Sequence, residues 1–427
     1  AGALEAEAKQ VAAALNAAGC AAPATFTATV LVNPTPNAVA TPSSQTICSG
    51  AAITTIALTG GVSGTTFNWT RDNTGTVTGI AGSGSGDISG SLTNTTNAPV
   101  TVTFTITPTA NGCPGTPVTA TVLVHPTPNA VATPSSQTVC SGLPITTIVL
   151  SGAVSGTTFN WTRDNTGTVT GIAASGAGDI SGTLTNTTNA PVTVTFTITP
   201  TANSCPGAPI TATVLVNPTP NATATPASQT VCSGSAITTI VLSSTTAGTT
   251  TYSWTRNNTG TVTGIAASGS GNISGTLTNT TNAPVTVTFT ITPSNSGCTG
   301  APITATVTVD PIPDVNQPAN QVVCNNSATA AVNFTGSVAG TIFNWTNSNP
   351  AIGLGASGTG NIPSFTATNA TNAPIVGTVT VTPTFTSGFT SQTFNYTGSV
   401  QTFTVPPGVT SLNITCFGAQ GENAAIG

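Results

Sequence analysis

A unit of about 92 residues recurs four times along this chain and constrains its fold more than any other feature. Each copy contains one tryptophan, at Trp69, Trp161, Trp254 and Trp345, which are 92, 93 and 91 residues apart. A cysteine keeps the same period, at Cys48, Cys140, Cys232 and Cys324. Because a repeat of this length is long enough to be a small domain, the sequence predicts a tandem array of folding units.

Within a unit, apolar residues stand two apart and threonines fill the gaps. In the first copy Val100, Val102, Phe104 and Ile106 alternate with Thr101 to Thr107. This period of two predicts a β-strand with one buried face and one wet face. The first copy is expected to form strands at residues 44–48, 53–58, 65–70, 75–80, 88–93, 100–107 and 118–124, with turns at 82–86 and 111–117.

About seven short strands in 92 residues, separated by turn signals, are typical of a β-sandwich. The expected fold class is therefore all-β, with tandem immunoglobulin-like sandwich repeats. The tryptophan is expected to be the centre of each small core, where its replacement by alanine would cost roughly 3–5 kcal/mol. The predicted structural core residues are Trp69, Trp161, Trp254 and Trp345.

Pro-x-Pro segments separate the units. They begin at Asn33, His125, Asn217 and Asp310, and their extended geometry predicts short, stiff linkers that hold the units in a rod. The expected division begins with residues 1–34, which comprise a helical segment at 1–19 and the last strand of a preceding repeat at 20–34. Repeats 1 to 4 follow (35–126, 127–218, 219–311 and a divergent 312–384), and then the start of an incomplete glycine-rich β domain (385–427).

Charge is almost absent, since only 3% of the residues are Asp, Glu, Lys or Arg. Three arginines and one lysine cannot form a basic patch, which argues against nucleic-acid binding. No apolar run reaches the 18 or so residues of a membrane span. The regular alternation of apolar residues argues against disorder.

The repeats resemble a known family in four motifs. These are Cys-Ser-Gly or Cys-Asn-Asn, Phe-Asn-Trp-Thr, Thr-Asn-Ala-Pro-Val-Thr-Val-Thr-Phe-Thr-Ile-Thr-Pro, and Gly-Cys-Pro-Gly. Together they are similar to the PKD-like immunoglobulin-fold repeats of large secreted surface proteins of Bacteroidota. The resemblance covers residues 20 to about 384. It implies a sandwich fold, export and a stalk or adhesin role, and it carries no catalytic or binding residue.

Nine cysteines and a single histidine favour disulfides and an oxidising compartment. Two pairings are open. The pairing within repeats keeps each unit self-contained and is favoured; it joins Cys48–Cys113, Cys140–Cys205 and Cys232–Cys298. The pairing between neighbours leaves only Cys416 over, and it joins Cys20–Cys48, Cys113–Cys140, Cys205–Cys232 and Cys298–Cys324.

No residues for catalysis come together in the sequence, so the chain is not expected to be an enzyme. The one histidine, His125, lies in a linker. The acids Asp72 and Asp87 have the amides Asn257 and Asn272 as counterparts in repeat 3, so they are expected to cap local backbone. A loop calcium ion held partly by Asp72 or Asp87 is the alternative, and no other cofactor or metal is expected. The arginine after each Trp-Thr, as in Arg71, is expected to pair with its neighbouring acid or to stack on a ring.

The leading functional hypothesis is a structural stalk or filament segment of a large extracellular surface protein, an adhesin, that spaces a functional domain from the cell. One alternative is a module whose loops bind a glycan or a protein partner. Another is a spacer for a secreted enzyme whose catalytic domain lies outside this chain. Exposed edge strands with few charges also suggest self-association into filaments.

Overall fold

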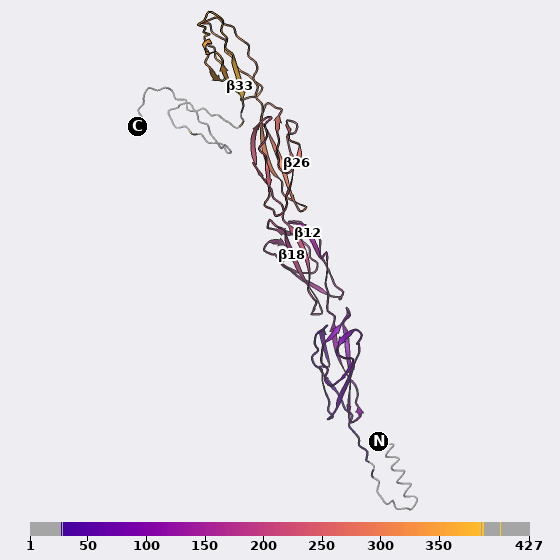
Figure 1. The fold of residues 1–427 in the computed structure, drawn as a ribbon. Helices are drawn as coiled ribbons and strands as arrows, with labels where there is room; N and C mark the ends of the chain where they lie inside the picture. Colours follow the sequence, from indigo (N-terminus) through magenta and orange to yellow (C-terminus); the bar gives the residue numbers. More distant parts are fainter. Residues whose placement is uncertain (1–26, 28, 386, 388–401, 403–427) are drawn as a thin grey trace, which may run out of the picture. The chain divides into compact units, whose positions relative to one another are not determined.

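A computed structural model gives the fold and describes residues 27, 29–385, 387 and 402. Strand-built modules follow one another along the sequence, from indigo to yellow in Figure 1. Contacts divide the chain into two units, Ala1–Pro218 with repeats 1 and 2, and Thr219–Gly427 with repeats 3 and 4. The predicted helix at residues 1–19 lies outside the described residues, as does nearly all of the further domain expected from residue 385.

Repeat 1 is built from ten short strands. They are β1 (Val39–Thr41), β2 (Ser44–Cys48), β3 (Ala57–Thr59), β4 (Thr66–Arg71), β5 (Val77–Gly79), β6 (Ser83–Ser85), β7 (Leu92–Asn94), β8 (Val100–Ala110), β9 (Cys113–Pro114) and β10 (Val118–His125).

Six of these strands form one sheet in the order β2-β10-β8-β4-β6, with β9 paired to the end of β8. All its pairings are antiparallel except that of β2 with β10, which is parallel and places Cys48 opposite His125. The ribbons β1-β3 and β5-β7, with the bridge between Ile56 and Ile88, form the second layer. The predicted fold class, an all-β immunoglobulin-like sandwich, is confirmed.

Repeats 2 and 3 copy this arrangement strand for strand. Repeat 2 contains β11 (Val131–Thr133), β12 (Ser136–Cys140), β13 (Val149–Ser151), β14 (Thr158–Arg163), β15 (Val169–Gly171), β16 (Ser175–Ala177), β17 (Leu184–Asn186), β18 (Val192–Ala202), β19 (Cys205–Pro206) and β20 (Ile210–Asn217). Repeat 3 contains β21 (Thr223–Thr225), β22 (Ser228–Cys232), β23 (Val241–Ser243), β24 (Thr251–Arg256), β25 (Val262–Gly264), β26 (Ser268–Ser270), β27 (Leu277–Asn279), β28 (Val285–Asn295), β29 (Cys298–Thr299) and β30 (Ile303–Asp310).

One predicted turn is wrong. Residues 82–86 were expected to turn because they are rich in Gly and Ser, but β6 lies there and pairs with β4. Gly84 is opposite Trp69 in this ladder, and a Cβ at Gly84 would lie 2.3 Å from Cζ2 of the indole. The glycine therefore serves close packing on the ring, which is a known reason for glycine within a strand.

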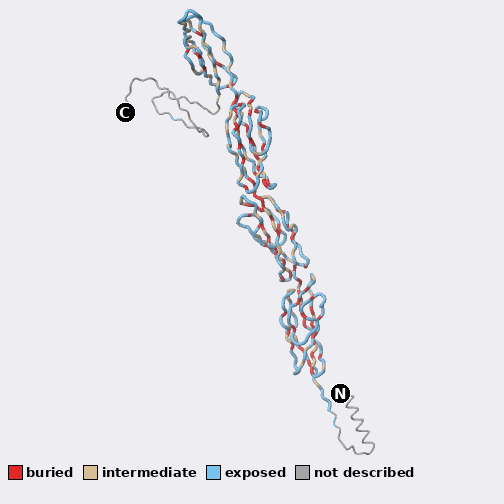
Figure 2. Tube along the Cα trace, in the orientation of Figure 1, coloured by how far each residue is buried: buried red, intermediate tan, exposed pale blue. Residues whose placement is uncertain are grey.

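The core of each sandwich consists of the residues that the period of two predicted to face inward. Val102, Phe104 and Ile106 are fully buried, and the intervening threonines are exposed or half-buried. Figure 2 shows buried residues along the inside of the strand-built modules and exposed residues along their outside. Each of the four core clusters draws its residues from a single repeat.

Repeat 4 is smaller in its described part. Its sheet has three strands in the order β32-β31-β33, namely β31 (Ile342–Asn347), β32 (Ser357–Thr359) and β33 (Val379–Thr384), and a 3-10 turn, η1 (Pro350–Ile352), follows β31. Four residues form its buried cluster, Phe334, Trp345, Leu354 and Ile362. The described residues contain no helix that is long and apolar enough to cross a membrane.

The strand expected in residues 20–34 is not found where it can be checked. Residues 20–26 and 28 lie outside the description, and residues 29–34 form no strand. Val30, Leu31 and Val32 are all exposed. The likeness of this segment to the last strand of a repeat predicted a strand here, but no strand in the described chain pairs with residues 29–34.

Candidate functional site

The four predicted core tryptophans lie at equivalent positions, each in a strand paired with a short glycine-containing strand, as β4 is with β6 in repeat 1. Each is buried to about the same degree, 8% exposed. In repeat 2 the indole Nε1–H of Trp161 donates to Gly178 O at 3.1 Å, and Phe196 packs edge-on at 5.6 Å between ring centroids. Trp69 and Trp254 make the same contacts. Trp345 Nε1 has no hydrogen-bond partner within the described residues.

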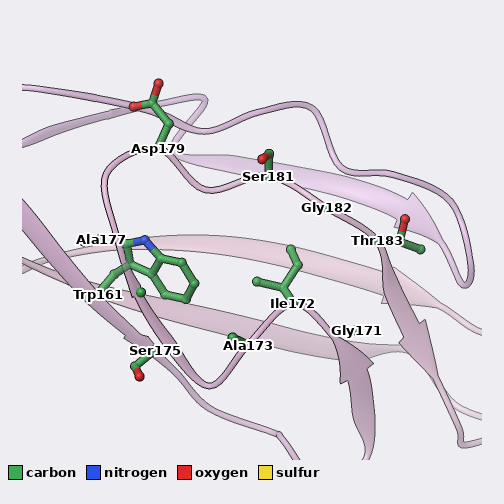
Figure 3. Close-up of a pocket in the computed structure, with 11 residues that line it drawn as sticks. Trp161, Gly171, Ile172, Ala173, Ser175, Ala177, Asp179, Ser181, Gly182 and Thr183 are labelled. Carbon is green, nitrogen blue, oxygen red and sulfur yellow. The ribbon is translucent and has the colours of Figure 1, made fainter.

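A shallow pocket lies beside Trp161 in repeat 2, and it is lined partly by Ile172, Asp179 and Ser181. Figure 3 shows the Asp179 carboxylate turned away from the indole. Its Oδ1 accepts the Leu150 N–H at 2.8 Å. Asp87 accepts the same bond in repeat 1, and the amides Asn272 and Asn361 accept it in repeats 3 and 4. Since an amide oxygen serves equally well, the negative charge is not needed for this role.

The second acid of the repeat also caps backbone. Asp72 Oδ1 accepts the Thr103 N–H at 2.7 Å, and Asp164 does the same with Thr195. In repeat 3 the amide Asn257 accepts the equivalent bond from Thr288 at 2.7 Å. Nowhere in the described chain do three His, Cys, Asp or Glu side chains gather as metal ligands. The calcium ion stays a proposal, with Asp72 or Asp87 among its ligands.

The arginines have a role that the sequence did not reveal. Arg71 Nε donates to Ile80 O at 2.8 Å, its Nη2 to Val77 O at 3.0 Å and its Nη1 to Asp72 O at 3.2 Å. These acceptors are backbone carbonyls, so the guanidinium holds the loop that leads from β5 to β6. Burial lowers the pKa of Arg71, opposed by the nearby Asp72 charge. Arg163 and Arg256 bind the equivalent carbonyls.

A buried asparagine ties β7 to β10 and was also missed. Asn94 Nδ2 donates to Ala98 O at 2.7 Å and to Val124 O at 2.9 Å, while its Oδ1 accepts the Thr96 N–H and hydroxyl. Asn94-Thr95-Thr96 also has the form of an Asn-x-Thr glycosylation sequon. Both amide hydrogens are used inside the fold, so the folded repeat does not present Asn94 for modification.

Both predicted disulfide pairings are wrong. Cys48 is bonded to Cys205, 157 residues away, with 5.5 Å between the Cα atoms. Cys140 and Cys298 are also disulfide-bonded. Of the remaining cysteines that the structure describes, Cys113, Cys232 and Cys324 carry no disulfide.

The reason lies in the position of the cysteines within a repeat. Cys48 ends β2 opposite His125, where the chain leaves repeat 1. Cys113 lies beyond the other end of β8, where it pairs with Ala110. The eleven residues of β8 span roughly 33 Å, whereas a disulfide requires Cα atoms within about 7 Å. A Cys48–Cys113 bond is therefore excluded.

The Cys48–Cys205 bond encloses the joint between repeats 1 and 2. On one side, the Ser49 N–H donates to His125 O at 2.8 Å, which fixes the start of the linker to repeat 1. On the other side, a Cβ at Gly207 would lie 1.9 Å from Pro128 O, so the end of the linker packs on the turn after Cys205. Only Pro126 and Thr127 lie between these anchors.

His125, the histidine of the linker between repeats 1 and 2, is half-buried, and its Nδ1 has no hydrogen-bond partner in the described structure. In unit 2 the equivalent Asp310 is buried; its Oδ2 accepts the Ser387 N–H at 3.0 Å, and its carbonyl accepts the Ser233 N–H. The glycine contact also recurs, since a Cβ at Gly300 would lie 1.8 Å from Pro220 O.

Fold and joints define a protein of tandem β-sandwich domains joined by two-proline linkers. The family model described as "PKD-like domain" matches residues 45–128, 137–220 and 229–313. Because these matches cover more than half of the 427 residues, the chain belongs to the PKD-like domain family, and this part of the predicted resemblance is confirmed. Repeat 4 lies outside the matched residues.

The solved structures that are similar to the chain have low sequence identity to it. Mouse cadherin-23 EC22-24 is 14% identical over 66% of this chain and 99% of that chain, with a TM-score of 0.33. A protocadherin gammaB7 EC3-6 cis-dimer structure is 13% identical over 81% and 99%, with a TM-score of 0.29. At these values the likenesses carry no functional conclusion. No curated protein matches the chain.

Proposed function

We propose that this chain is a stalk segment of an extracellular surface protein and that it spaces a functional domain from the cell. The observation that carries the proposal is the joint between repeats 1 and 2, where a two-residue linker is anchored at both ends and enclosed by a disulfide. Linkers of this kind restrict bending between domains, which is the property that a spacer needs.

The surface and the chemistry of the repeats agree with this role. The disulfides suit the oxidising environment outside the cell. The Asp179 carboxylate and the Trp161 indole N–H of the pocket make internal hydrogen bonds, so these two groups do not favour a glycan site over a spacer. We also propose an adhesin role, a location at the cell surface and the absence of an active site in the repeats.

A distance measurement across the joint tests the proposal. Labels attached through unnatural amino acids at Ser63 and Ser155, which are exposed and equivalent in repeats 1 and 2, report the distance between the domains. We expect a narrow distance distribution in the oxidised full chain. A six-residue Gly-Ser insertion between Pro126 and Thr127 is the control, and it should broaden the distribution. An equally broad distribution in the unmodified chain would contradict the stalk.

A further inference from the structure

The Cys48–Cys205 disulfide changes which part of the chain can be stretched. Cys48 lies near the beginning of repeat 1 and Cys205 near the end of repeat 2. A chain pulled from its two ends carries tension along its shortest covalent path. In a chain whose Cys140 and Cys298 are replaced, so that their bonds add no further route, that path enters through β1 and β2, crosses the disulfide and leaves through β20, and the residues between Cys48 and Cys205 are bypassed.

The bypassed segment contains most of both domains. It includes β3 to β10 of repeat 1 and β11 to β18 of repeat 2. The cores built around Trp69 and Trp161 lie within it, as do Pro126 and Thr127 of the linker. A bond within each repeat would bypass less, because it would leave the joint and one end of each domain on the path.

From this connectivity we propose that the disulfide is a mechanical strap that limits extension of the stalk. The inference rests on the proposed function, since only a stalk under tension would use the strap. In a chain without the Cys140 and Cys298 bonds, and with the Cys48–Cys205 bond closed, pulling on repeats 1 and 2 can extend residues 38–48 and 206–218, which span about 8 nm when stretched. With the bond open, the 157-residue separation adds about 55 nm.

Reduction would release the strap in a defined step. A dithiol supplies two electrons and two protons to the Cys48–Cys205 bond and becomes a cyclic disulfide, which leaves two thiols on the protein. The folded sandwiches remain, but tension then passes through both of them in series. The strap is therefore closed in an oxidising compartment and open under reducing conditions.

Single-molecule pulling of the full chain by its two ends tests the strap. The background variant is Cys140→Ser with Cys298→Ser, which removes the other disulfide-bonded cysteines of the described chain. We expect the total contour length of this variant to rise by about 55 nm when Cys48→Ser is added. Addition of a dithiol to the background variant should give the same gain. Cys232→Ser replaces an exposed thiol and should leave the length unchanged.

Equal contour lengths for the background variant with and without Cys48→Ser would overturn the strap. Tryptophan fluorescence of each variant shows whether the sandwiches are folded. If the Cys48→Ser variant does not fold, addition of a dithiol to the background variant opens the same bond without that substitution. The outcome is separate from that of the proposed function. A broad label distribution across the joint with a 55 nm gain would contradict the stalk but leave the covalent limit on extension in place. A narrow distribution without the gain would support the stalk and contradict the strap.

Discussion

Trp161 and Gly176 are paired across β14 and β16 so closely that a Cβ at the glycine would lie 2.3 Å from the indole Cζ2. The same pair recurs as Trp69 with Gly84, Trp254 with Gly269 and Trp345 with Gly358. The indole ring at the centre of each core therefore packs directly against the backbone of a glycine.

A methyl group at Gly176 should destabilise repeat 2. We expect Gly176→Ala to cost roughly 1–3 kcal/mol, because the rigid ring and the strand must move apart. In denaturant unfolding followed by tryptophan fluorescence, this appears as an early transition of one repeat. Gly167→Ala is the control, since its Cβ meets nothing within 4 Å. Equal stability of the two variants would show that the contact is not tight.

Replacement of the buried asparagine should also be costly. Asn186→Ala removes two Nδ2 bonds, to Ala190 O and Val216 O, and leaves the Thr188 N–H without its acceptor. We expect a loss of about 1–3 kcal/mol in the denaturant unfolding of repeat 2. The matched variant is Asn369→Ala, whose residue is half-buried and has one Nδ2 bond in the described chain. It should cost clearly less.

Asp164, at the start of the loop from β14 to β15, should be replaceable by its amide. Asp164→Asn is expected to change the free energy of unfolding by less than about 0.5 kcal/mol, because Asn257 makes the same bond in repeat 3. Thermal unfolding with calcium and with a chelator tests the calcium proposal in the same samples. A calcium-dependent rise in Tm that disappears in Asp72→Asn with Asp164→Asn would show that these acids hold the ion.

Trypsin can distinguish the three disulfide patterns, because cleavage after Lys9, Arg71, Arg163 and Arg256 separates the cysteines. We expect unreduced, denatured protein to give peptide 10–71 joined to peptide 164–256. Pairing within repeats would instead join 10–71 to 72–163, and pairing between neighbours would place the Cys48 bond inside 10–71. Mass spectrometry before and after reduction identifies the pair, and alkylated free thiols serve as the internal control.

Repeat 4 should lose stability in acid through one group. Hydrogen bonds from the Ser337 backbone N–H and its hydroxyl lower the pKa of Asp314. This stabilisation is present above the ordinary pKa of Asp and is lost as the pH falls through the lowered value. Asp314→Asn should remove this acid dependence from thermal unfolding at low salt, since Asn37 and Asn129 accept the equivalent bond as amides. Identical pH profiles for both proteins would exclude Asp314 as the cause.

The period of two and the repeat length were enough to predict the sandwich and its core, because burial of Phe104 and its neighbours follows directly from alternation. The cysteine pairing was not predictable in this way. It depends on which end of a sandwich holds each cysteine, and the parallel pairing of β2 with β10 that decides the position of Cys48 has no local signal. The buried role of Asn94 could not be predicted, because the pattern Asn-x-Thr is shared by a surface glycosylation sequon and a buried backbone cap.

Asp179 and Asn272 accept a hydrogen bond from the equivalent backbone N–H in different repeats. The isoelectric point of a repeat can therefore change while its fold stays the same. A duplicated copy can acquire or lose an acid at this position while its architecture is preserved. Arrays of any length can therefore be adjusted for colloidal solubility one copy at a time, without new packing in any domain.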